Sequence, residues 1–314
     1  MGLRSTLVLK AIRYTGKDNY PLILNLEISH ACNLFCEACG RVRSAKGGKL
    51  SVEQCTNAID ETKAPVIYFT GGEPLLNKSL PEVVDYALRN NRIVFVVTNG
   101  MLLKERVSNL TPHQNLALDV SIDGLKKEHD HIRGEGVFDR ALEGIKEAKS
   151  RGHRIYTNTT IYKVNMGVLG DMMHLLDGLI DSFYFMPIFN YFESEESLTR
   201  DEIRKIGEEL LKLYKRYPIA NSISYLDFLK GKELKCTPWG TVTLDPRGWK
   251  SPCYFLTDDY YPTFDELREN TDWRRFEYKR DERCTICFSH CGHEPTVIRK
   301  KGLLLKNFVK SIIT

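Results

Sequence analysis

The chain has 314 residues, of which 42% are hydrophobic and 27% charged, and its formal net charge is +4. These values are typical of a soluble globular protein with room for one large α/β domain and a smaller appendage. The weak charge, without a dense run of Lys and Arg, gives no reason to expect a nucleic-acid partner. No apolar run reaches the roughly 20 residues of a membrane-spanning helix. Residues 1–16 do not read as a signal peptide, so we expect a cytoplasmic protein.

Short β-rich runs alternate with amphipathic helical patterns from about residue 22 onward. The runs predict strands at 22–28, 66–70, 93–98, 117–122, 154–162 and 182–189. The patterns predict helices at 51–61, 80–89, 138–151 and 167–179, followed by a charged helix at 199–215. Repeated β–α units with right-handed crossovers favour a parallel sheet that curls into a barrel. The predicted fold class is therefore α/β, a partial TIM barrel of the (β/α)6 type with a small cysteine-rich C-terminal domain.

The pattern changes after the charged helix to short segments rich in Gly, Pro, Trp and Cys. We therefore predict four parts: an N-terminal extension, a barrel, a cysteine-rich domain and a basic amphipathic tail, at 1–20, 21–217, 218–298 and 299–314. In the tail, Leu304, Phe308 and Ile312 recur at helical spacing beside lysines. This segment could lie on an anionic membrane surface or could pack against the barrel.

Nine cysteines divide into two groups and one single residue. In a reducing compartment, grouped cysteines bind metal more often than they form disulfides. Cys32, Cys36 and Cys39 follow the first predicted strand, and three thiolates at this spacing can hold a [4Fe–4S] cluster whose fourth iron has no protein ligand. A zinc site with His30 as the fourth ligand is the alternative. Cys55 lies within a predicted helix, and we expect it to be a core or surface residue.

The Cys-x3-Cys-x2-Cys spacing resembles the signature of the radical S-adenosylmethionine (SAM) superfamily. Gly71-Gly72-Glu73-Pro74, after the second strand, is similar to the segment that contacts the amino group of SAM in that superfamily. The resemblance implies that SAM chelates the open iron and that an electron from the cluster cleaves it to a 5′-deoxyadenosyl radical. It also implies an electron donor of the flavodoxin or ferredoxin type.

Polar residues follow the later strands as well, and in barrels of this kind the carboxyl ends of the strands face the active site. Asn158 or Thr160 could reach the ribose, and Met186 could border the adenine. Arg133 could pair with the SAM carboxylate or lie on a helix surface. The resemblance thus implies SAM contacts from Gly71, Gly72, Glu73, Thr98, Asn99, Ser121, Asp123, Arg133, Asn158 and Met186.

The C-terminal region is similar to the SPASM and twitch extensions of radical SAM proteins, in which cysteines hold auxiliary clusters. The resemblance implies one auxiliary [4Fe–4S] cluster, for which four of the five cysteines suffice. The cysteines are Cys236, Cys253, Cys284, Cys287 and Cys291. The alternative is a zinc ribbon that uses the last three with His290 or His293.

Several segments of the cysteine-rich domain resemble a narrower group, the adenosylhopene (adenosylhopane) synthase family of hopanoid biosynthesis. Among them are Cys236-Thr237-Pro238-Trp239-Gly240 and the run His290–Thr296. The resemblance implies that the adenosyl radical adds to an alkene of an isoprenoid lipid, with the substrate reaching the barrel from a membrane. The aromatic residues expected to line such a barrel are Phe69, Phe95, Tyr156, Tyr184, Phe185 and Tyr191.

The sequence departs from that narrower family at Val97, where we expect a cysteine that donates a hydrogen atom to the substrate radical. Two other functions therefore stay open. The first is a hydrogen-abstracting radical SAM enzyme that acts on a peptide or small molecule with the help of an auxiliary cluster. The second is a non-catalytic iron–sulfur or zinc protein.

Overall fold

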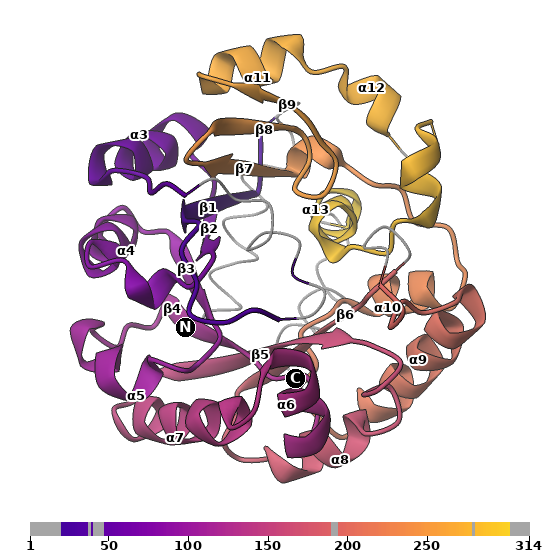
Figure 1. Ribbon diagram of the computed structural model, residues 1–314. Coiled ribbons are helices and arrows are strands. Elements are labelled where there is room, and N and C mark those ends of the chain that lie inside the picture. Colours follow the sequence, from indigo (N-terminus) through magenta and orange to yellow (C-terminus); the bar gives the residue numbers. More distant parts are fainter. Residues whose placement is uncertain (1–19, 37–38, 40–46, 190–193, 278–279, 302–314) are drawn as a thin grey trace.

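The structure is a computed structural model that describes residues 20–36, 39, 47–189, 194–277 and 280–301. Its centre is a sheet of 9 strands in the order β6-β5-β4-β3-β2-β1-β7-β8-β9. The first six are parallel to their neighbours and curl into an open barrel with helices around the outside (Figure 1). These strands are β1 (Ile23–Ser29), β2 (Val66–Gly71), β3 (Ile93–Thr98), β4 (Leu116–Ser121), β5 (Arg154–Ile161) and β6 (Ser182–Pro187). The prediction of an α/β partial barrel is confirmed.

The helices of the barrel follow the β–α alternation of the sequence. They are α3 (Val52–Thr62), α4 (Leu80–Arg89), α5 (Leu103–Arg106), α6 (Lys126–Arg133), α7 (Val137–Ser150), α8 (Leu169–Leu175) and α9 (Arg200–Leu213). The helix predicted at 167–179 is shorter than expected, and the separate helix α6 was missed because eight residues give too few turns for a clear apolar period.

Side-chain hydrogen bonds determine where the first barrel helix, α3, begins. Ser51 accepts a hydrogen bond from the backbone N–H of Gln54 (3.0 Å), and the Gln54 side chain accepts one from the Ser51 N–H (2.9 Å). This capping box satisfies two backbone donors at the start of α3. Cys55 is buried in the core one turn later, as expected. Its burial raises the pKa of the thiol to about 12, so it is an inert packing residue.

Successive strand residues point alternately to the helices and to the inside of the barrel. Phe95, Tyr156 and Tyr184 point inward, as predicted. Phe69 and Phe185 do not, because they fall on the alternate positions and are completely buried in the helix-facing core. The prediction that these two line the barrel is wrong, and Tyr68 takes the inward position beside Phe69. Tyr191 lies outside the described residues.

The cysteine-rich region continues the same sheet. Strand β7 (Thr241–Asp245) is parallel to β1, and β8 (Gly248–Pro252) and β9 (Thr257–Tyr261) follow in antiparallel order. The remaining helical segments of this region are α10 (Ile223–Leu229), η4 (Pro238–Gly240), α11 (Phe264–Asn270), α12 (Trp273–Phe276), η5 (Glu282–Ile286) and α13 (His290–Lys301). The boundary near residue 217 stays a prediction.

Helix α13 lies on the concave side of the sheet, between β6 and the ribbon β7–β9 (Figure 1). The free edge of β6 is covered by Asn221, whose side-chain amide bonds the backbone N–H and C=O of Phe185 (2.8 and 2.9 Å). The C-terminal region thus covers part of the exposed edge of β6.

No helix in the described ranges is long and apolar enough to cross a bilayer. Most of the N-terminal extension lies outside the described residues, and so do Leu304, Phe308 and Ile312, on which the alternative of membrane contact rests.

Candidate active site and cysteine clusters

A cavity of about 850 Å³ fills the inside of the barrel. At one end it is lined by Cys32, Cys36 and Cys39, which follow β1. At the other end it reaches the aromatic side chains of Tyr68 and Phe95, whose rings stack 4.6 Å apart. A volume of this size is within the range of small-molecule and cofactor sites.

The three cysteines after β1 lie close together along the chain. The backbone N–H of Leu34 donates to Cys32 Sγ (3.5 Å), and the N–H of Cys39 donates to the carbonyl of Cys36 (3.1 Å). Burial raises the pKa of the Cys32 and Cys36 thiols, and the negative charge of Cys39 raises both further. Thiolates that repel one another in a partly buried loop are stabilised by a bound cationic centre. The donor set therefore fits an iron–sulfur cluster.

Gly71 and Gly72 bring the end of β2 against this loop. A Cβ atom on Gly72 would lie 2.1 Å from the carbonyl oxygen of Ala31, and one on Gly71 would lie 2.3 Å from that of Ser29. The backbone N–H of Gly72 donates to Ser29 O (2.8 Å). Only glycine permits this approach. Because both glycines also line the cavity, their backbone is open to a ligand beside the cysteines.

Glu73 lies behind the cavity wall rather than in it. Its completely buried carboxylate accepts hydrogen bonds from Thr98 Oγ1 (2.8 Å), the Asn99 N–H (2.8 Å) and the Leu75 N–H (3.0 Å). Burial raises its pKa, and the bonds from Asn99 and Leu75 oppose that shift. Asn99 in turn donates to Asn33 in the cysteine loop (2.8 Å). Glu73 therefore ties the ends of β2 and β3 to the loop.

Arg133 reaches the cavity from the end of α6. Its Nε lies 2.6 Å from Asp123 Oδ2, and Asp123 Oδ1 accepts from the Thr160 N–H (2.8 Å). Burial raises the pKa of the Cys36 thiol, and the positive charge of Arg133 opposes that shift. Arg133 thus faces the cysteine loop and the cavity instead of solvent.

Eight of the ten residues expected to contact SAM line this cavity, and the other two, Glu73 and Asp123, hold residues that do. The eight are Gly71, Gly72, Thr98, Asn99, Ser121, Arg133, Asn158 and Met186. They come from the carboxyl ends of five neighbouring strands and from α6. Their role as SAM contacts stays a prediction.

The five C-terminal cysteines surround a second, much smaller cavity of about 40 Å³. Cys253 Sγ accepts from the Leu256 N–H (3.4 Å), Cys287 Sγ from the Ser289 N–H (3.5 Å), and Cys291 Sγ from Ser289 Oγ (3.1 Å). Burial, together with the charge of Cys253, raises the pKa of Cys291 to about 12. These thiols fit a buried metal centre for the same reason as the first group.

The two histidines of the zinc-ribbon alternative point different ways. The ring of His290 packs edge-on against Tyr184 (4.5 Å) and lines the barrel cavity. His293 lines the small cavity, where it stacks on Phe228 (4.2 Å) and its Nδ1 lies 2.5 Å from the carbonyl of Ser289. Cys236 and Cys253, which the ribbon would not need, lie at the same cavity.

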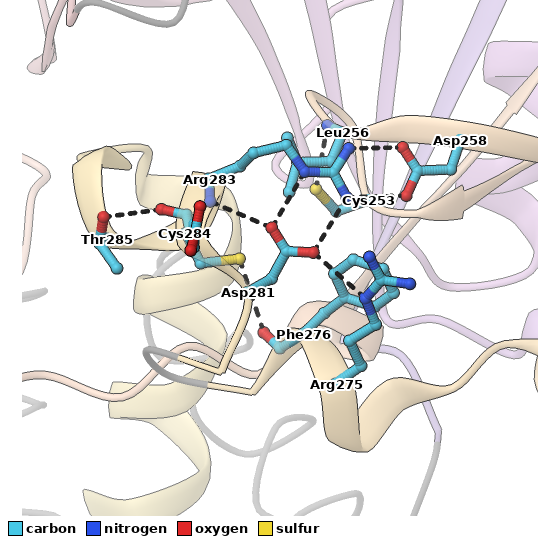
Figure 2. Close-up of polar contacts among 10 residues, drawn as sticks. Cys253, Leu256, Asp258, Arg275, Phe276, Asp281, Arg283, Cys284 and Thr285 are labelled. Atoms are coloured by element: carbon cyan, nitrogen blue, oxygen red, sulfur yellow. Dashed lines mark hydrogen bonds and ion pairs between the residues drawn. The ribbon is translucent and has the colours of Figure 1, made fainter.

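A charged network holds two of these cysteines in place (Figure 2). Arg283 bonds Asp258 through Nη1 (2.7 Å) and Asp281 through Nε (2.9 Å), and Arg275 Nε lies 3.3 Å from Asp281. The bonds from Arg283 lower the pKa of Asp281 to about 2. The network joins β9 to η5, and so holds the turn that carries Cys253 against the turn that carries Cys284.

The two cavities share part of their walls. Thr241, Phe255, Ser289 and Cys291 line both of them. A metal centre on the C-terminal cysteines would therefore lie next to a molecule bound in the barrel.

His30, considered as a zinc ligand for the first group, lies beside Asp245. Its Nε2 lies 3.5 Å from Asp245. Glu27, His30 and Asp245 bring one ligand atom each within 4.8 Å of one another. However, Lys250 Nζ already bonds Glu27 (2.8 Å) and lies 3.5 Å from Asp245, so a positive charge is in place without a metal.

Sequence reasoning missed two carboxylates in the cavity wall, the buried Asp119 and the half-buried Glu294. Burial raises the pKa of each to about 7. The signal for Asp119 was available, because it is a charged residue at an inward position of an otherwise apolar strand. Glu294 lies on α13, whose Gly, Pro and Cys residues hide any apolar period.

The family comparisons divide the chain in two. The radical SAM superfamily matches residues 26–176. A domain of unknown function (DUF3463) matches residues 185–311.

Individual relatives match over part of their length. Fe-coproporphyrin III synthase of Methanosarcina barkeri is 32% identical over 171 residues, which are 52% of this chain and 42% of that protein. Mycofactocin maturase MftC of Mycobacterium ulcerans is 32% identical over 166 residues, 50% of this chain and 44% of that protein. The antilisterial bacteriocin subtilosin biosynthesis protein AlbA of Bacillus subtilis is 24% identical over 268 residues, 79% and 59% respectively. The chain thus spans about half the length of these relatives.

Solved structures agree on the fold. Native anSMEcpe with bound AdoMet superimposes with a TM-score of 0.65 at 17% identity, covering 93% of this chain and 98% of that one. Streptococcus suis SuiB bound to the precursor peptide SuiA gives 0.63 at 14% identity, covering 84% and 64%.

Proposed function

We propose that this chain is a radical SAM enzyme, because residues 26–176 match the radical SAM superfamily. We further propose that it removes a hydrogen atom from a substrate held in the barrel cavity. An auxiliary cluster on the C-terminal cysteines would accept the next electron. The observation that carries this proposal is the shared wall of the two cavities, in which Cys291 faces both.

The family implies a [4Fe–4S] cluster and SAM, which when bound supply a 5′-deoxyadenosyl radical. Cys32, Cys36 and Cys39 would hold the cluster. The open backbone at Gly71 and Gly72 would receive the amino group of SAM, and the guanidinium of Arg133 would balance its carboxylate.

The C-terminal cysteines would hold the auxiliary cluster, for which four thiolates suffice. Cys236 and Cys253 support this assignment over a zinc ribbon, because they lie at the same small cavity as Cys284, Cys287 and Cys291. His290 supports it as well, since its ring faces Tyr184 in the barrel cavity.

Val97 supports an oxidative outcome. It lines the cavity at the position where the adenosylhopane synthase family is expected to have a hydrogen-donating cysteine. A valine side chain has no S–H or O–H bond to give up. A substrate radical formed beside it is therefore more readily oxidised through the adjoining metal centre than reduced by the protein.

The relatives support peptides or cofactor precursors as substrates. Their names include a mycofactocin maturase and a bacteriocin biosynthesis protein, and SuiB is bound to a precursor peptide. We propose that the present substrate belongs to one of these classes.

A second candidate function is transfer of the adenosyl group to an alkene of an isoprenoid or hopanoid-type lipid. The aromatic floor of the cavity supports it, because Tyr68, Phe95 and Tyr156 form a continuous apolar surface with ring centroids 4.6 and 5.5 Å apart. Such a surface suits a hydrocarbon substrate.

Isotope transfer separates the two candidates. The holoenzyme is reconstituted without oxygen and incubated with SAM, dithionite and a metabolite and peptide extract from cells grown in deuterated medium. Hydrogen abstraction predicts 5′-deoxyadenosine one mass unit heavier than with an unlabelled extract. Adenosyl transfer predicts unlabelled 5′-deoxyadenosine and a new adenosine-containing product. Neither product above the extract-free background would contradict both candidates.

A further inference from the structure

Asp119 is a buried carboxylate in the middle of β4 that faces the barrel cavity. Only 4% of the surface of Asp119 is exposed to solvent. Asn158 Nδ2 donates to Asp119 Oδ2 at 3.4 Å, and Oδ1 has no hydrogen-bond partner in the part of the chain that the structure describes. Buried carboxylate oxygens are normally paired, because leaving one unpaired is costly. Asp119 is therefore available to a ligand.

The side chains around Asp119 are apolar or aromatic. Its neighbours in the sheet are Val97 on β3 and Tyr156 on β5. Phe95 lies against Tyr156 in an edge-on contact of 5.5 Å and stacks on Tyr68. Burial raises the pKa of Tyr68, and the charges of Asp119 and, from α13, Glu294 raise it further. None of the groups that act on this ring carries a positive charge.

Each arginine and lysine that lines the cavity is paired with a carboxylate. Arg133 lies 2.6 Å from Asp123, Arg247 lies 2.8 Å from Asp245, and Lys250 lies 2.8 Å from Glu27. No basic side chain among residues with a described position pairs with Asp119. Within the described part of the chain, Asp119 is therefore left without a cationic partner, which a ligand can supply.

We propose that Asp119 binds an ammonium group, so that the substrate of this enzyme is an amine carried on an apolar or aromatic frame. This inference rests on the barrel cavity being the substrate site, as proposed above. The aromatic rings beside Asp119 favour an ammonium over a neutral hydroxyl, because ring faces attract cations. Free amino groups of this kind occur on peptides and on many small cofactor precursors.

The same arrangement disfavours a plain hydrocarbon. A hydrocarbon at this position would exclude water from Asp119 and offer it no hydrogen bond. Burial raises the pKa of Asp119 to about 7, opposed only by the Asn158 bond, so the group is charged in part of the molecules at neutral pH. An ammonium would stabilise the charged form.

The test uses two probes that differ in one group, 2-phenylethylammonium and 2-phenylethanol. Both are titrated by calorimetry into the oxygen-free holoenzyme with SAM present. We expect the ammonium to bind at least about ten-fold more tightly than the alcohol. We expect Asp119→Asn to remove this preference and Glu294→Gln to retain it, since Glu294 already accepts a bond from the Ser222 N–H (2.8 Å). Iron content and circular dichroism check that both variants fold.

A second measurement needs no variant. The ammonium preference of the wild-type protein should grow between pH 6 and pH 8 as Asp119 ionises, while an amine of pKa near 10 stays protonated. The inference is overturned if the wild type shows no preference for the ammonium, including no binding of either probe, or if its preference does not change with pH. It is also overturned if the preference survives in Asp119→Asn, or if that variant loses SAM binding instead of amine binding.

Formation of 5′-deoxyadenosine from SAM is measured in the same samples. If it persists while the ammonium preference is absent, the inference about Asp119 fails and the proposed radical chemistry stands. If it is absent while the preference is present, the reverse holds.

Discussion

The two cysteine groups are assembled and enclosed in opposite ways. Cys32, Cys36 and Cys39 come from one loop and open on a cavity of about 850 Å³. The C-terminal five come from several segments between Cys236 and Cys291, among them η5 and α13, and they surround only about 40 Å³. A centre that must bind a second molecule needs a missing ligand and room beside it. A centre that only passes electrons needs a complete ligand set and little else.

Their supports differ in the same sense. The barrel group is held by buried contacts from neighbouring strand ends, such as the bond from Asn99 to Asn33 (2.8 Å). The C-terminal group is held by the ion-pair network of Arg283 with Asp258 and Asp281 (Figure 2). Loss of either group should thus leave the other in place, and three of the following four predictions test that independence.

The largest effect is expected from Cys36→Ala. This change removes one of three ligands from a centre that has no spare, so we expect bound iron to fall by one cluster and 5′-deoxyadenosine formation to be abolished. Iron analysis and chromatography measure the two. Cys55→Ala is the matched control, because it removes a buried thiol that faces neither cavity. Full 5′-deoxyadenosine formation in Cys36→Ala would refute the assignment of the first group.

The next effect is expected from Cys291→Ala. The thiol that faces both cavities is lost, so we expect the second cluster to be lost or weakened and substrate oxidation to stop. Slow 5′-deoxyadenosine formation should continue, because the first group is untouched. Zinc in the purified wild type, together with unchanged iron in the variant, would instead favour the zinc ribbon.

The same contrast explains what the sequence could predict. The first group was readable because its cysteines are three and four residues apart and its neighbours follow consecutive strands of a parallel sheet. Parallel strands place their carboxyl ends together, so distance along the chain did not matter. The convergence of the C-terminal cysteines depends on α13 and on β7 joining β1, and neither had a local signal.

Two smaller errors have physical causes as well. Phe69 and Phe185 were placed inside the barrel on composition, whereas the alternation of the strands sends them to the helices. Asp119 was not predicted as a site residue, because an apolar run with a single charged residue still predicts a buried strand. The missing information was which alternate residues of each strand face the cavity, and the pairing of the strands decides this.

A smaller effect, on stability, is expected from Asp119→Asn. The folded-state pKa of Asp119, about 7, lies above the unfolded value of about 3.9. The folded protein therefore holds a proton that the unfolded chain has released, and the free energy of unfolding falls as pH rises from about 4 to 7. We expect the variant to be more stable than the wild type by about 1–3 kcal/mol at pH 8, and by less at pH 5.5. Urea unfolding at the two pH values measures this, and a variant less stable at pH 8 would contradict it.

The smallest effect is expected from Arg283→Lys. Arg283 forks between Asp258 and Asp281, and a lysine ammonium cannot match both carboxylates. The Arg283 side chain is 39% exposed, so solvent and salt weaken these bonds and the loss should be about 1 kcal/mol or less. A loss that shrinks between 50 mM and 500 mM salt would identify the ion pairs as its source. Because the network holds the turns of Cys253 and Cys284, a chelator should also extract iron faster from the C-terminal group of the variant. The rate for the barrel group should not change, and equal acceleration at both groups would show that the two sites are not independently supported.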